Sequence, residues 1–187
     1  MKKICFLFLI GMLMLTGCSV KKTNELTDAE KFSREYGVSK DNPFKYLTID
    51  ETIDMLEHGS GIIFLGNSDC EWCTASAKIL TKALKEKNVD QAYYYNPKKI
   101  RDKNTKKYKK LVSLLGDNLE KDEEDKPYLF IPDIYVVKDG KIIEHNNDLA
   151  TMDGTVDDAL TKERKQETKK KYLKLITKYV IKDCTSC

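Results

Sequence analysis

Hydrophobic and polar positions along this chain predict alternating helices and strands. Two short helices begin at capping boxes, in which a threonine and a glutamate three residues later bond to each other's backbone N–H groups. These boxes pair Thr27 with Glu30 and Thr48 with Glu51, and Gly37 would end the first helix. The apolar run at 61–66, bounded by glycines, is typical of a strand buried on both faces.

The pattern becomes helical from residue 71 to 87 and strand-like from 91 to 95. The highly charged stretch 98–126 then interrupts the alternation. It contains one helical stripe that ends at Gly116, and we expect residues 120–126 to form a solvated loop. The stripe consists of Tyr108, Leu111, Val112 and Leu115.

Asp139-Gly140 predicts a tight hairpin between the flanking stretches 134–137 and 141–144. A last helix over residues 161–182 would bury five apolar or aromatic residues, Tyr172, Leu175, Ile176, Tyr179 and Val180. Strands that alternate with helices and end in a hairpin predict an α/β fold class. We expect a small mixed sheet with helices on both faces.

Composition argues against two classes of function. A formal net charge of +3 over 187 residues gives no case for nucleic-acid binding. Arginine occurs only at positions 34, 101 and 164, which argues against a site built on forked phosphate contacts. The chemistry to explain lies in the six cysteines, Cys5, Cys18, Cys70, Cys73, Cys184 and Cys187.

The first two cysteines belong to a targeting segment. Two lysines precede an apolar run at 4–15, which is short for a transmembrane helix, and Leu15-Thr16-Gly17-Cys18 follows. This tetrad resembles the lipobox of bacterial lipoproteins. The resemblance implies that residues 1–17 are removed, that Cys18 is lipidated, and that the protein is held at the extracytoplasmic face of the cell membrane. An ordinary secretory signal and an uncleaved anchor are the alternatives.

We expect four parts in the chain: the signal peptide 1–17, a tether with the first helix at 18–44, a domain at 45–183, and a tail at 184–187. An extracytoplasmic location would let disulfides persist. Cys5 would leave with the signal peptide.

The motif that carries the chemistry is Cys70-Glu71-Trp72-Cys73, between the buried strand and the long helix. Unpaired amides and the dipole at a helix start stabilise a thiolate, so Cys70 is the expected nucleophile. Cys73, three residues on, faces the same side and can resolve a mixed disulfide. We expect Ser68 to cap this helix. A static local disulfide or half of a zinc site would have the same spacing.

The order of strand, CxxC, helix, Ile131-Pro132 and hairpin resembles the thioredoxin superfamily. Within it, the chain is similar to thioredoxin-like lipoproteins of Gram-positive bacteria, related to the bacteriocin-transport accessory proteins. The resemblance implies a thioredoxin-like fold with a helical insertion, here about 98–126, before a strand that follows a cis-proline. It implies that Pro132 is cis beside the CxxC and that the backbone of Ile131 pairs with an extended substrate. Without it, a trans bond at the start of a strand would be expected.

The motif departs from ordinary thioredoxin in its neighbours. Asp69 and Glu71 bring negative charge close to Cys70 and oppose thiolate formation. The position six before Cys70 is Phe64, where the family has a buried acid, so no proton acceptor for Cys73 is identified. Trp72 is expected beside the site rather than deep in the core.

Cys184 and Cys187 form a second CxxC at the end of the chain. Three hypotheses compete for it: a local disulfide, a second redox pair that exchanges with the first, and a zinc site made of all four cysteines.

The sequence thus predicts a membrane-anchored thiol–disulfide oxidoreductase acting on protein thiols or disulfides. It needs no cofactor beyond its redox-active disulfide and no metal. A membrane thiol-electron donor is an expected partner by family analogy, nucleic acid is not, and the direction of electron flow stays open. The alternative is a thioredoxin-like binding or secretion-accessory module, or a thiolate metal carrier, without redox turnover.

Overall fold

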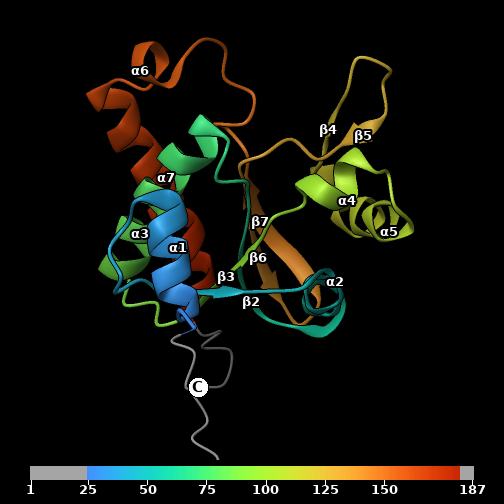
Figure 1. Ribbon diagram of the computed structural model, residues 1–187, viewed down its shortest axis with the longest axis horizontal. Coiled ribbons are helices and arrows are strands. Elements are labelled where there is room, and N and C mark those ends of the chain that lie inside the picture. Colours follow the sequence, from blue (N-terminus) through green and yellow to red (C-terminus); the bar gives the residue numbers. More distant parts are fainter. Residues whose placement is uncertain (1–24, 182–187) are drawn as a thin grey trace, which may run out of the picture.

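The computed structural model describes residues 25–181, and they build one α/β unit around a five-stranded sheet (Figure 1). Its strand order is β1-β3-β2-β6-β7. The first three strands run parallel, whereas β6 is antiparallel to β2 and β7 to β6. The strands are β1 (Phe44–Tyr46), β2 (Gly61–Leu65), β3 (Ala92–Tyr95), β6 (Asp133–Lys138) and β7 (Lys141–Asn146). This mixed topology is consistent with a thioredoxin-like fold.

Helices cover both faces of the sheet, as the alternation predicts (Figure 1). One face packs against α1 (Asp28–Tyr36), α3 (Glu71–Glu86) and α7 (Lys162–Val180), the other against α2 (Ile49–His58) and α5 (Lys106–Leu115). Because side chains alternate along a strand, β2 supplies Ile62 and Phe64 to the first core and Ile63 and Leu65 to the second. All five β2 residues are buried, which confirms the prediction from residues 61–66.

The first helix docks through aromatic rings. Its capping box at Thr27 forms as predicted, and Gly37 closes it with a φ of 62°. Phe32 is fully buried and stacks on Tyr36 and Phe44, with ring centroids 4.5 and 4.0 Å apart. Aromatic pairs of this kind add about 0.5–1.5 kcal/mol beyond the area they bury. Helix α1 therefore belongs to the core formed by α3 and α7.

The predicted hairpin forms between β6 and β7. Asp139 and Gly140 both have positive φ values, 48° and 70°, which is the geometry of a tight turn matched to the twist of its strands. The turn packs against the end of α2, where the Gly140 N–H donates to the Gly59 carbonyl at 2.9 Å. Ser60 Oγ accepts from the Asp139 N–H at 2.9 Å. The hairpin is thus tied to the helix that covers its face.

The inserted segment is more structured than its charge suggests. It contains α4 (Lys98–Asp102), α5, the 3₁₀ turn η1 (Gly116–Asn118), and the small hairpin of β4 (Glu120–Lys121) and β5 (Pro127–Tyr128). The stripe ending at Gly116 is confirmed as α5. The expectation of a plain loop at 120–126 is wrong at its start. The reason is local: Asp122 Oδ1 accepts the N–H groups of Glu124 and Lys126, which closes a turn.

The last helix follows a short one, α6 (Val156–Ala159), and begins after the N-cap Thr161. Tyr172, Leu175 and Ile176 are buried as predicted, and Tyr179 is partly buried. Val180, in contrast, is 43% exposed, because it is the last residue of the helix and the core does not extend over it. Within residues 25–181, every helix is too short or too polar to span a bilayer.

Candidate functional site

Cys70 is itself the N-cap of α3. Its Sγ accepts a hydrogen bond from the backbone N–H of Cys73 at 3.1 Å. The expected cap, Ser68, is wrong: the chain first turns between Asn67 and Cys70, where the Cys70 N–H donates to the Asn67 carbonyl at 3.0 Å, so the helix starts two residues later. A sulfur therefore occupies the place where a hydroxyl or carboxylate usually satisfies the first amides. An anionic sulfur gains most from that position.

The contacts of Cys70 make it a stronger acid than an ordinary cysteine. Its pKa is lowered to about 7, chiefly because the side chain of Cys73 donates a hydrogen bond to it. Burial opposes this effect, while the backbone N–H groups of Cys73 and Trp72 and the charge of Arg101 reinforce it. These hydrogen bonds lower the pKa of Cys70 although Asp69 and Glu71 lie next to it in the sequence, and the side chains of both acids are exposed to solvent.

Cys73 has the opposite character. It is fully buried, and its pKa is raised well above the usual range because its thiol donates to Cys70 and because burial disfavours the charged form. Both cysteines are free thiols. Phe64 occupies the place expected for a buried acid and packs with Tyr36 and Tyr94 instead. The pair therefore combines one acidic, half-buried thiol with one buried thiol that keeps its proton.

The fold brings a distant segment to Cys70. The Ile131-Pro132 bond is cis, as the resemblance implied, and Pro132 is buried. The carbonyl oxygen of Ile131 lies 4.0 Å from Cys70 Sγ, although the two residues are 61 positions apart. Trp72 lies in the first turn of α3 and packs, half-buried, against the adjoining core. Four of the residues expected at the site, Cys70, Cys73, Ile131 and Pro132, thus belong to one neighbourhood.

Three other expected site residues, Cys18, Cys184 and Cys187, lie outside the described residues. The zinc hypothesis needs two of them, so its full ligand set is not described. Among residues 25–181, no three His, Cys, Asp or Glu side chains converge on a common metal position.

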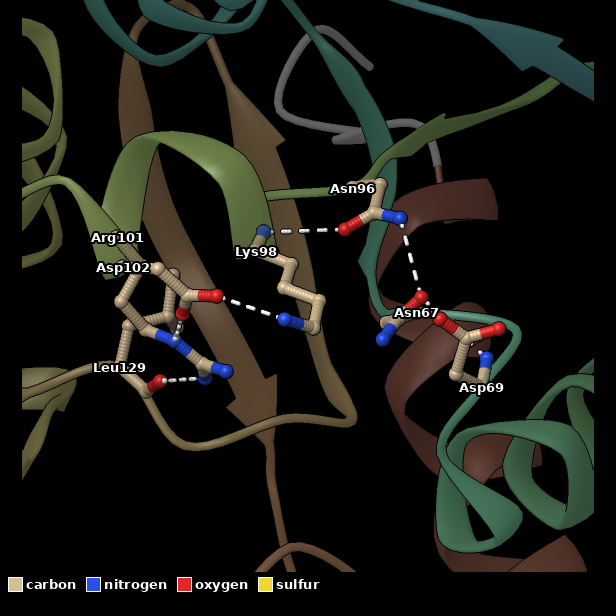
Figure 2. A network of polar contacts seen from close by, with 7 residues as sticks. All are labelled: Asn67, Asp69, Asn96, Lys98, Arg101, Asp102 and Leu129. Carbon is tan, nitrogen blue, oxygen red and sulfur yellow. Dashed lines mark hydrogen bonds and ion pairs between the residues drawn. The ribbon is translucent and has the colours of Figure 1, made fainter.

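A polar network links the CxxC loop to the inserted segment (Figure 2). Asn67 Oδ1 accepts from the Asp69 N–H at 3.3 Å and from Asn96 Nδ2 at 3.2 Å. Asn96 Oδ1 in turn accepts from the Lys98 N–H at 3.0 Å, in the first turn of α4. Sequence reasoning missed these amides, because their partners are separated by about 30 positions and nothing local marks the pairing.

A buried acid does occur near the site, but on another strand. Asp133 follows Pro132 directly and is 1% exposed. Burial raises its pKa, and its neighbours are the Tyr135 hydroxyl, which donates to it, and His145 Nδ1 at 3.6 Å. It lies on the face of the sheet that carries Tyr135 and Val137, whereas Cys73 lies on the other. The sequence could have indicated this buried acid, because Asp133 begins an otherwise apolar strand directly after the expected cis-proline.

No protein-family model matches this chain, and no curated protein matches it. The site is a Cys70–Cys73 pair at the N-terminus of a helix, in an α/β domain with a mixed five-stranded sheet.

Proposed function

We propose that this protein is a thioredoxin-like thiol–disulfide oxidoreductase that works through Cys70 and Cys73. The observation that carries the proposal is the unequal acidity of the two thiols. Cys70 has a pKa of about 7 and caps α3, while Cys73 is buried with a raised pKa. A thiol that is partly ionised near neutral pH can attack a disulfide, and a second thiol that keeps its proton does not compete with it.

The exchange proceeds in two balanced steps. The Cys70 thiolate attacks one sulfur of a substrate disulfide, the substrate S–S bond breaks, and the departing thiolate takes a proton from solvent. Cys73 then attacks Cys70 Sγ, the mixed disulfide breaks, and the second substrate thiolate leaves and takes the proton that Cys73 gives up. Two electrons have passed to the substrate, and Cys70 and Cys73 are joined in a disulfide. The reverse sequence oxidises a substrate dithiol.

The substrate would lie along the segment before β6. The Ile131 carbonyl lies 4.0 Å from Cys70 Sγ, so an extended peptide that pairs with the Ile131 backbone would carry its disulfide past the nucleophile. Pro132 shapes this edge of the site, and Trp72, half-buried in the first turn of α3, offers an apolar contact. Protein thiols and disulfides are therefore the proposed substrates.

The location follows from the N-terminal motif, which lies outside the described residues. Acyl chains at Cys18 would hold the protein at the extracytoplasmic face of the membrane, where disulfides persist. A membrane thiol-electron donor would then recharge the pair, and no soluble cofactor is needed. Cys184 and Cys187 would form either a local disulfide or a second exchanging pair.

Reduction of insulin by the full-length chain in the presence of a dithiol tests this function. We expect turnover with the wild-type protein and none with Cys70→Ser, because that change removes the attacking sulfur. Cys73→Ser should instead accumulate mixed disulfides, since the resolving thiol is lost. The double variant Cys184→Ser, Cys187→Ser is the control, which removes the two tail thiols and leaves Cys70 and Cys73 in place.

Two outcomes would contradict the proposal. Activity that survives Cys70→Ser would show that the pair is not the catalyst. A stoichiometric amount of tightly bound zinc, together with no turnover, would favour the alternative of a thiolate metal carrier.

A further inference from the structure

The sheet topology places the start of the inserted segment beside the CxxC loop. Strands β2 and β3 are parallel neighbours, with Leu65 paired to Tyr95. The chain leaves β2 toward Cys70 and leaves β3 toward α4, so both segments emerge at the same edge of the sheet. The Gly66 N–H to Tyr95 carbonyl bond, at 3.2 Å, fixes this proximity. Helix α4 therefore follows the strand end that lies beside the start of the CxxC loop.

Arg101 on α4 is unusual among the charged residues of the insertion because its side chain is only 16% exposed. Nη1 donates to the carbonyl of Leu129 at 3.0 Å, and the guanidinium lies 5.4 Å from the ring centroid of Tyr128. Figure 2 shows the guanidinium of Arg101 beside Leu129 and Asp102, with Lys98 nearer to the loop of Asn67 and Asp69. Arg101 is thus fixed between α4 and the segment of Tyr128 and Leu129.

The charge of Arg101 is incompletely paired. Its nearest carboxylate is Asp102, 3.8 Å from Nε, and that carboxylate also accepts the shorter ion pair from Lys98 at 2.7 Å. Arg101 Nε is buried without a hydrogen-bond partner. A guanidinium with no close bidentate partner is only partly neutralised and can attract other anions nearby.

Two effects of Arg101 converge on the dithiol. Leu129, which it holds, precedes Ile131 by two residues, and the Ile131 carbonyl lies 4.0 Å from Cys70 Sγ. Its positive charge also lowers the pKa of both Cys70 and Cys73. The first effect concerns the position of the substrate-facing segment, and the second concerns the anionic sulfur.

We propose that Arg101 is a positioning residue of the dithiol site: it fixes the segment from Leu129 to Pro132 and places a positive charge at the edge of the sheet from which the CxxC loop emerges. The effect of Arg101 on the redox equilibrium rests on the proposed function. Because stabilising the reduced, thiolate form makes a dithiol pair more oxidising, Arg101 shifts the Cys70–Cys73 equilibrium toward the dithiol.

The experiment compares Arg101→Gln and Arg101→Lys with a matched control, Arg164→Gln, which removes the same charge from the exposed first turn of α7. In the full-length chain, alkylation of the Cys70 peptide is followed by mass spectrometry as a function of pH. We expect Arg101→Gln to raise the midpoint by about half a pH unit, roughly a threefold change in the ratio of thiolate to thiol. Arg101→Lys and Arg164→Gln should keep the wild-type midpoint.

A second measurement separates position from charge. Arg101→Lys retains the charge but not the planar guanidinium whose Nη1 holds the Leu129 carbonyl. We expect it to raise KM for a peptide disulfide several-fold while leaving the reaction with a small aromatic disulfide unchanged. A residue that only stabilised the fold would not separate these two substrates.

An unchanged alkylation midpoint in folded Arg101→Gln overturns the proposal. If that variant does not fold, Arg101→Met, which keeps an apolar stem beside Tyr128, is judged by the same criterion. Because alkylation reports on Cys70 without turnover, a shifted midpoint in a protein that fails to reduce insulin would reject the proposed function and support the role of Arg101.

Discussion

Single side chains around Pro132 owe their protonation to one or two contacts each. Cys70 becomes more acidic because Cys73 donates a hydrogen bond to it, and Cys73 becomes less acidic for the same reason. Asp133, directly after the proline, becomes less acidic because burial outweighs its neighbours Tyr135 and His145. The pKa of Cys70 is thus lowered and that of Cys73, three positions later, is raised. Both shifts can be measured.

We predict that the free energy of unfolding falls as the pH rises above 6.5, the ordinary pKa of His145. Asp133 raises the pKa of this imidazole, and Glu144 and Glu120 act in the same direction. A base with a raised pKa in the folded state contributes stability that is complete below its unfolded pKa and is lost as the pH rises through its folded pKa. The raised pKa of Asp133 likewise makes the free energy of unfolding fall as the pH rises, because ionising Asp133 beside a neutral His145 leaves a buried anion without a cation.

Urea unfolding between about pH 5.5 and about pH 8.5 measures this loss of stability. His145→Gln should flatten the dependence. His58→Gln, which changes the exposed histidine at the end of α2, should leave it as in the wild type. An equal slope in the wild type and in His145→Gln would show that the pair with Asp133 is not responsible.

Elements whose signals are local were predictable from the sequence. The capping boxes at Thr27 and Thr48 and the turn at Asp139-Gly140 each need only a few neighbouring residues, and all three form as predicted. The same logic explains the failure at Ser68. A serine before a helix is a good cap only if the chain enters the helix there, and the turn from Asn67 to Cys70 delays the entry.

The short elements and the environment of the dithiol were not predictable. Helix α4 has five residues, no side-chain cap and no buried residue, so neither its pattern nor its start marks it. Arg101 is placed by the Leu129 carbonyl, 28 positions away. Such contacts depend on how strands β2 and β3 lie together, which is information that one sequence does not display locally. The dithiol could be located from the sequence, but its surroundings could not.

We predict that Gly140→Ala destabilises the domain much more than Gly154→Ala. Both glycines have positive φ values, 70° and 84°, which cost an alanine about 1–2 kcal/mol. A Cβ at Gly140 would also lie 2.0 Å from the carbonyl oxygen of Glu57, whereas one at Gly154 meets nothing within 4 Å. Backbone at the end of α2 cannot move aside without separating from the hairpin, so we expect about 1–3 kcal/mol more at Gly140.

Chemical unfolding of the two variants measures this difference, with Gly154→Ala as the control for backbone conformation alone. Equal losses would mean that the hairpin turn is not packed against α2 as described.

At the level of the whole molecule, the dithiol lies where the two helical layers meet the end of the sheet. Helix α3 carries Cys70 from one layer, and the inserted segment carries Arg101 from the layer of α5. The segment before β6 passes between them and ends at Pro132 (Figure 1). The state of the dithiol is therefore coupled to the stability of the entire domain, because unfolding removes every contact that sets the two pKa values.

We predict from this coupling that the reduced protein gains stability relative to the oxidised protein as the pH rises from about 7 to 9. The pKa of Cys70 is about 7 in the folded state and 9.0 ordinarily. An acid with a lowered pKa in the folded state contributes stability that is complete above its unfolded pKa and is lost as the pH falls through its folded pKa. Above pH 9 the trend should reverse, because the raised pKa of Cys73 has the opposite sign.

The measurement is the difference in Tm between the two redox forms at each pH. Groups such as His145 titrate in both forms and cancel in this difference. All proteins compared carry Cys184→Ser and Cys187→Ser, so that Cys70 and Cys73 are the only redox pair that contributes to it. We expect a gain of roughly 2 °C for the reduced form, since 1 kcal/mol moves Tm by about 2–4 °C at this size and partial exposure of Cys70 weakens the effect. Cys70→Ser, Cys73→Ser has no dithiol to titrate and should show no difference between reducing and oxidising conditions. A wild-type difference that stays constant or shrinks between pH 7 and 9 would mean that α3 does not stabilise a thiolate at Cys70.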